Sequence, residues 1–81
     1  QAIIGITALL KKRSVVLAGH ATSVALEPEF WAVLDRVAAE RGLSQAGLLA
    51  WIDETRGRRS LASACRLLAL SHAAQVAPRG H

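Results

Sequence analysis

Cys65 and His72 are the closest this sequence comes to a nucleophile with a general base, and their spacing argues against catalysis. They lie seven residues apart, which is about 10 Å along an α-helix. A nucleophile and its base need hydrogen-bond contact, at roughly 3 Å. We therefore predict that Cys65 is a small core residue and that the protein is not an enzyme.

Metal and cofactor chemistry also lacks a supporting pattern. His20, His72 and His81 do not have the spacing of metal ligands. The six glycines are scattered along the chain and form no phosphate-binding loop. We expect no metal site and no cofactor.

The charged residues are segregated along the chain, which points to an anionic partner. The net charge is +4, yet all six acids lie between residues 27 and 54. Six acids against two arginines give that segment −4, so the flanks carry +8. Most of the flanking charge lies in residues 11–13 and 56–59. Basic flanks of this kind favour binding to a polyanion. The alternative is that these residues are only solvated surface charge.

Two short strands are predicted ahead of the helices. Residues 14–17 have β-branched character, and residues 22–26 alternate strictly, as a half-buried strand does. Residues 18–20, around Gly19, interrupt them. The two segments form either a hairpin around Gly19 or one long arm with a bulge there.

A first helix is predicted over residues 28–41. Pro28 suits a first turn, where its missing N–H is not needed, and Gly42 can take the left-handed conformation that ends a helix. Apolar residues at helical spacing make one stripe along it, which Trp31 widens.

Two further helices are predicted after a short turn. Ser44 is a good N-cap for the second helix, and Gly57 is expected to end it. The third begins at Ser60 or Ser63 and ends near Gln75. Its apolar residues occupy most of its circumference, which indicates burial on more than one side and hence a dimer interface.

The chain is expected to form one small domain. We predict an N-terminal extension over residues 1–11, the domain over 12–75 and a flexible tail over 76–81. Cys65 is the single cysteine, so no internal disulfide can reinforce the domain, and oligomerisation is expected instead. A single cysteine also fits a cytoplasmic protein. The apolar opening is about half the ~20 residues needed to cross a bilayer, so we expect no membrane partner. Binding of this segment and the basic leader to a membrane surface is a third hypothesis, but the segment is short and has no strong amphipathic moment.

Residues 20–56 resemble a ribbon-helix-helix domain, the family of small dimeric DNA-binding repressors. The resemblance rests on the alternating TSVAL strand, the LEPEFW start of the first helix, the AAERGLS link and the LLAWIDE run of the second helix. Over about residues 12–71, the chain is also similar to a subfamily with a KRS leader, a GH-x-TSV strand and an added third helix.

The resemblance implies a mostly α fold with a short N-terminal β element, built as an intertwined homodimer. The strand of each chain pairs antiparallel with its twin, and the resulting β-ribbon lies in the major groove of double-stranded DNA, so the protein is expected to regulate transcription. The resemblance implies that Ala21, Ser23, Ala25, Ser44 and Gln45 contact DNA. The basic leader adds Lys11, Lys12 and Arg13 to these expected DNA contacts. The residues expected in the core or dimer interface are Thr22, Val24, Leu26, Phe30, Trp31, Leu34, Val37, Leu48, Trp51, Ile52 and Leu68.

A second hypothesis comes from the short side chains at the positions where the family reads bases. Ala21 and Ala25 cannot donate a hydrogen bond, and Ser23 is short, so little base discrimination follows from them. The alternative is a protein-interaction module, an antitoxin-like or regulatory partner that uses the same dimeric core to bind another protein.

Overall fold

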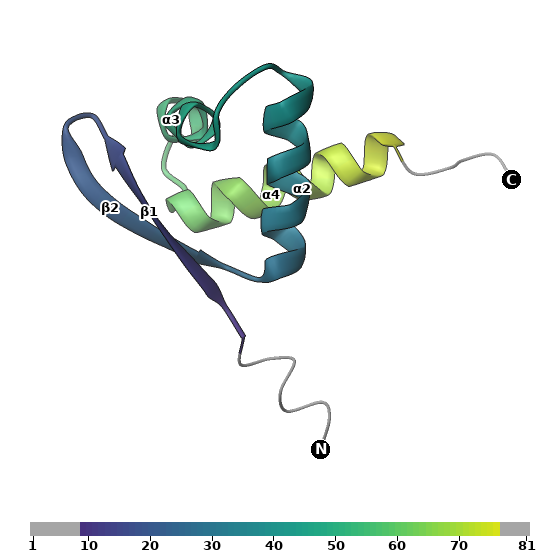
Figure 1. Ribbon diagram of the computed structural model, residues 1–81, viewed down its shortest axis with the longest axis horizontal. Helices are drawn as coiled ribbons and strands as arrows, with labels where there is room; N and C mark the ends of the chain where they lie inside the picture. The colour runs from purple at the N-terminus through teal and green to yellow at the C-terminus, as the bar shows by residue number, and fades with distance from the viewer. Residues whose placement is uncertain (1–8, 77–81) are drawn as a thin grey trace, which may run out of the picture.

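The structure, a computed structural model, describes residues 9–76. The expected extension and tail therefore lie largely outside the described residues. The elements are two strands followed by three helices, as the sequence predicts (Figure 1). They are β1 (Lys11–Leu17), β2 (His20–Leu26), α2 (Pro28–Glu40), α3 (Gln45–Thr55) and α4 (Leu61–Val76).

β1 and β2 form an antiparallel hairpin, so the hairpin alternative is confirmed. All seven residues of each strand are paired, beginning with Leu17 opposite His20 at the turn. The two-residue link has φ +52° at Ala18 and +83° at Gly19. A type I′ turn requires positive φ at both central residues, and its twist matches that of the two strands. Within this chain, β2 therefore pairs with β1. Pairing of β2 with the same strand of a second chain stays a prediction.

The inward face of the hairpin joins the core. Val15 and Leu17 of β1 are buried there with Val24 and Leu26 of β2. Thr22, expected in the core, lies opposite Val15 in the ladder but is exposed. The reason is that α3 packs against β1 and α4 against β2, and Thr22 lies on the part of β2 nearer the turn, beyond its buried residues.

The core is assembled from the hairpin and all three helices of one chain. α4 packs against α2, α3 and β2, and Figure 1 shows it passing behind α2. Two residues expected in the core or the interface, Phe30 and Leu68, are partly buried, whereas Trp51 is 42% exposed beside the buried stripe of α3. The helical core residues are Trp31, Leu34, Val37, Ala38, Leu48, Leu49, Ile52, Cys65 and Ala69.

The predicted helix ends are confirmed by hydrogen bonds. Gly42 has φ +69°, and the N–H of Leu43 donates to the carbonyl of Ala38 at 2.8 Å, which is the pattern of a helix closed by a left-handed glycine. Ser44 Oγ accepts from the N–H of Gly47 at 3.0 Å. Of the two serines proposed for α4, it is Ser60 whose hydroxyl accepts from a backbone N–H, that of Ser63. Within residues 9–76, no helix has the length and apolar character to span a bilayer.

The turn of the hairpin gives a direct test of this fold. Ala18→Asn should raise the free energy of unfolding by about 0.5–1 kcal/mol, because asparagine adopts positive φ more readily than alanine. Gly19→Val should lower it by about 1–2 kcal/mol. A Cβ at this glycine would meet no atom within 4 Å, so the loss would be backbone strain alone. Denaturant unfolding measures both changes; a neutral Gly19→Val would contradict the turn.

Candidate nucleic-acid interface

The outward face of the hairpin carries the three residues predicted to read bases, Ala21, Ser23 and Ala25. Side chains alternate across a strand, so the residues between the buried ones point away from the helices. Across the ladder they form three pairs: a basic one, a hydroxyl one and an apolar one. These pairs are Lys12 with Ala25, Ser14 with Ser23, and Val16 with Ala21.

This outward face is exposed, and its chemistry is varied despite the small side chains. Val16 is 67% exposed, and the hydroxyls of Ser14 and Ser23 lie on the same face, where each can donate or accept a hydrogen bond. Lys12 adds a cation at the end of the hairpin away from the turn. The face therefore offers one charged, one polar and one apolar contact zone in succession.

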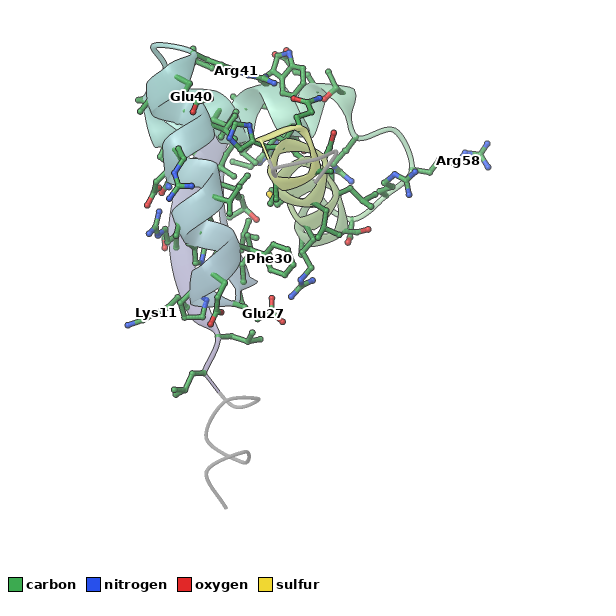
Figure 2. The ribbon with its side chains drawn as sticks, turned by 90° about the vertical axis from the view of Figure 1, so that its right-hand side faces the viewer. Lys11, Glu27, Phe30, Glu40, Arg41 and Arg58 are labelled. Atoms are coloured by element: carbon green, nitrogen blue, oxygen red, sulfur yellow. The ribbon has the colours of Figure 1, made fainter. Side chains whose placement is uncertain are left out.

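The basic leader forms the first part of β1, at the end of the ribbon away from the turn. Lys11, Lys12 and Arg13 line a depression of about 390 Å³ together with Pro28, Trp31, Ala32 and Asp35 of α2. Among the described residues, none of β2 lines it. Figure 2 shows Lys11 near the first turn of α2, with its side chain directed away from the protein. The two lysines are exposed, so this side of the ribbon offers free ammonium groups.

Arg13 differs from the two lysines because it is held by α2. Its guanidinium donates to both carboxylate oxygens of Asp35, at 3.0 and 3.4 Å, and lies 4.5 Å from the centre of the Trp31 ring. Arg13 is thus an intramolecular clamp between β1 and α2, with its charge already neutralised by a carboxylate.

Asp35 also brings the start of α3 to this clamp. The Nε2 of Gln45 donates to the same carboxylate oxygen that Arg13 uses. Arg13 and Gln45, both predicted DNA contacts, therefore meet at one acid, although they lie far apart in the sequence. Ser44 precedes Gln45 and is exposed, with its hydroxyl capping α3. The start of α3 therefore lies next to the clamp between β1 and α2.

The second basic cluster, residues 56–59, does not join the first. Arg56 binds Asp53 at 2.7 Å and the carbonyl of Arg59 at 2.6 Å. In Figure 2, Arg58 and Lys11 extend to opposite sides of the protein. The leader is therefore the basic cluster that belongs to the ribbon.

Comparison with known proteins identifies the fold. A family model described as a ribbon-helix-helix domain matches residues 10–73. The chain belongs to the ribbon-helix-helix family. Domains of this family are in general DNA-binding modules of regulators, and they are typically not enzymes. No curated protein and no solved structure matches the chain.

The interactions that the sequence analysis missed include two that join distant parts of this ribbon-helix-helix domain. One is the clamp at Asp35. The other joins α4 to the start of α2, where Arg66 donates to Glu27 at 3.0 Å and lies 5.8 Å from the Phe30 ring. A backbone hydrogen bond and Arg66 together hold the pKa of Glu27 below its ordinary value. Each pair joins residues more than 20 positions apart, which periodicity cannot reveal.

Cys65 is a buried residue of the core, and its surroundings disfavour a nucleophile. Burial raises the pKa of its thiol to about 11, so the reactive thiolate is scarce at neutral pH. In the part of the chain that the structure describes, no three His, Cys, Asp or Glu side chains gather as a metal site would require.

The clamp can be opened without unfolding the ribbon-helix-helix domain. Asp35→Asn should change the free energy of unfolding by less than about 1 kcal/mol, because the Arg13 and Asp35 side chains are 37% and 50% exposed. The guanidinium of Arg13 should then become mobile, which faster exchange of its Nε–H in NMR spectra would report. Asp53→Asn, which removes the ion pair with Arg56, is the control and should leave Arg13 unchanged. A loss of several kcal/mol would contradict a weak clamp.

Proposed function

We propose that the protein is a homodimeric transcriptional regulator that binds double-stranded DNA by placing the outward face of the hairpin in the major groove. The single observation that carries this proposal is the ribbon: two antiparallel strands with one face packed on the core and the other exposed, with free lysines at the end away from the turn. The general DNA-binding role of the family supports it. As a regulator bound to DNA, it would act in the cytoplasm.

Each zone of the ribbon suits a different part of a DNA groove. The major groove, about 12 Å wide, admits a two-stranded ribbon. Ser14 and Ser23 can hydrogen-bond base edges, and Val16 with Ala21 can contact thymine methyl groups. Phosphates would be bound by the leader lysines and by the amides at the start of α3, near Ser44 and Gln45. In this arrangement phosphates supply most of the affinity, and the small side chains read bases weakly.

The leader lysines are the sharpest test of DNA binding. Lys11→Ala with Lys12→Ala should weaken binding and reduce the slope of log affinity against log salt by roughly 0.9 for each phosphate that the protein no longer neutralises. Fluorescence anisotropy of a labelled mixed-sequence duplex, titrated at several salt concentrations, measures both quantities. Arg58→Ala with Arg59→Ala removes the same charge on the other side and should leave the slope nearly unchanged. Equal losses in the two variants would mean that only net charge matters.

The proposed homodimer interface lies on α3 and α4. Trp51, Leu67 and Leu70 are 42%, 42% and 56% exposed. Trp51 and Leu67 line a groove of about 190 Å³ between the two helices, and Leu70 follows on α4. The one charged residue of α4, Arg66, is committed to Glu27.

Arg56 and Arg59 also line this groove, and the guanidinium of Arg41 lies 4.8 Å from the centre of the Trp51 ring, so the apolar face has a basic rim. Arg56 is paired with Asp53. An apolar centre with charged residues at its edge can meet its own copy across a two-fold axis.

Charges placed on this face should separate the protomers. Leu67→Glu with Leu70→Glu should convert the dimer to a monomer in analytical ultracentrifugation, because the interface would bury four like charges. Val16→Glu is the control, since it charges a more exposed apolar residue on the ribbon and should leave the dimer intact. Circular dichroism would check that both variants fold. A dimer that survives the double substitution would place the interface elsewhere.

A second candidate function, a protein-interaction module, is favoured by the same exposed face of α3 and α4. In that case the face would take another protein, and Ala21 and Ala25 would have no bases to read. Absence of DNA binding by the unaltered chain even at low salt, with the dimer intact, would support this candidate over the first.

A further inference from the structure

The carboxylate of Asp35 is bound by donors from two other elements, as an incoming anion would be. Arg13 of β1 donates to both of its oxygens, at 3.0 and 3.4 Å, and Nε2 of Gln45 at the start of α3 donates to one of them. We propose that Asp35 occupies a phosphate site of this protein and prevents one phosphate of the DNA backbone from binding there, which lowers the affinity for DNA of any sequence. This inference rests on the proposed function.

The donors around Asp35 suit a phosphate as well as they suit a carboxylate. A guanidinium presents parallel N–H groups to either anion, and a glutamine amide adds another donor. Lys11 and Lys12 line the same depression as Arg13, and both lysines are exposed. The depression therefore has three cations against one acid, so its positive charge exceeds what its own carboxylate neutralises.

The site is open to solvent and has a second support besides Asp35. The side chains of Asp35 and Arg13 both keep solvent contact, and the depression beside them has a volume of about 390 Å³. The ring of the buried Trp31 lies 4.5 Å from the guanidinium of Arg13, and its Nε1 donates to the carbonyl of Lys11 at 2.7 Å. These contacts of the indole do not depend on the charge of Asp35, so they would keep the first part of β1 in place without it.

A carboxylate at this position would limit the sequence-independent part of DNA binding. A phosphate contact raises affinity but carries no sequence information. Under the proposed function, Ala21 and Ala25 read bases weakly, so discrimination depends on keeping the affinity for other sequences low. Asp35 neutralises Arg13 and also repels a phosphate at the same place. Its charge would therefore remove one contact that every DNA sequence could make.

Removal of the charge on Asp35 tests this inference. Asp35→Asn keeps the size of the side chain and releases Arg13 from its ion pair. The mixed-sequence duplex should then bind about five- to tenfold more tightly near 0.1 M salt, and the slope of log affinity against log salt should become steeper by roughly 0.9, as expected for one added phosphate. Fluorescence anisotropy at several salt concentrations measures both quantities.

Two variants separate a phosphate site from a simple change in net charge. Asp53→Asn is the matched control, because Asp53 also pairs with an arginine, Arg56, and neither residue lines the depression. It should leave the salt slope nearly unchanged. Asp35→Asn with Arg13→Ala has the net charge of the unaltered chain but lacks the released guanidinium, so the gain in affinity should disappear.

The other outcomes would overturn the inference. If Asp35→Asn binds no more tightly than the unaltered chain or than Asp53→Asn, no phosphate site is released, and the proposed function stands. Weaker binding by Asp35→Asn would mean that the clamp presents Arg13 and Gln45 to DNA instead of withholding them. Absence of DNA binding by both the unaltered chain and Asp35→Asn would overturn the proposed function, and with it the role of this site in DNA binding.

Inorganic phosphate provides a second measurement that does not require DNA. Phosphate titrated in place of chloride at constant ionic strength should shift the NMR signal of the Arg13 Nε–H in Asp35→Asn and leave it unchanged in the unaltered chain. Absence of a shift in the variant would contradict a phosphate site. An equal shift in both proteins would mean that Asp35 does not prevent phosphate from binding.

Discussion

The pairing of β1 with β2 is the interaction on which the rest of the structure depends. It is made possible by two adjacent residues with positive φ, Ala18 and Gly19, which reverse the chain tightly enough for every strand residue to find a partner. Once paired, the strands sort their side chains into an inward and an outward face. The inward face forms part of the core, and the outward face stays exposed.

The helices complete that core within a single chain. α3 packs against β1, and α4 packs against β2, α2 and α3. This closure explains why an 81-residue chain can bury Trp31, Leu34 and Leu48 without a partner. Dimerisation would therefore not be needed to complete this core. The large apolar side chains that stay exposed include Trp51, Leu67 and Leu70 on the helices and Val16 on the ribbon.

The basic residues fall into two groups: arginines that pair with acids of the same chain, and lysines that stay exposed. Arg13, Arg56 and Arg66 each hold an acid of the same chain, while Lys11 and Lys12 stay exposed at one end of the ribbon. Asp35 is central to this division, since it neutralises Arg13 and also orients Gln45. The cluster at residues 11–13 therefore serves two purposes: its lysines can meet phosphate, and its arginine fastens β1 to α2.

The sequence by itself determined the order of elements, the helix ends and the family. Those features involve only residues that are close together in the sequence, such as the cap at Ser44, the left-handed Gly42 and the alternation of residues 22–26. Only the tertiary structure decided that β1 folds back onto β2, that Thr22 and Trp51 stay exposed, and that Arg13 belongs to Asp35. These outcomes depend on which distant surfaces meet when α3 and α4 pack against the hairpin. Periodicity gives the apolar side of an element, but it does not say how much of that side another element will cover.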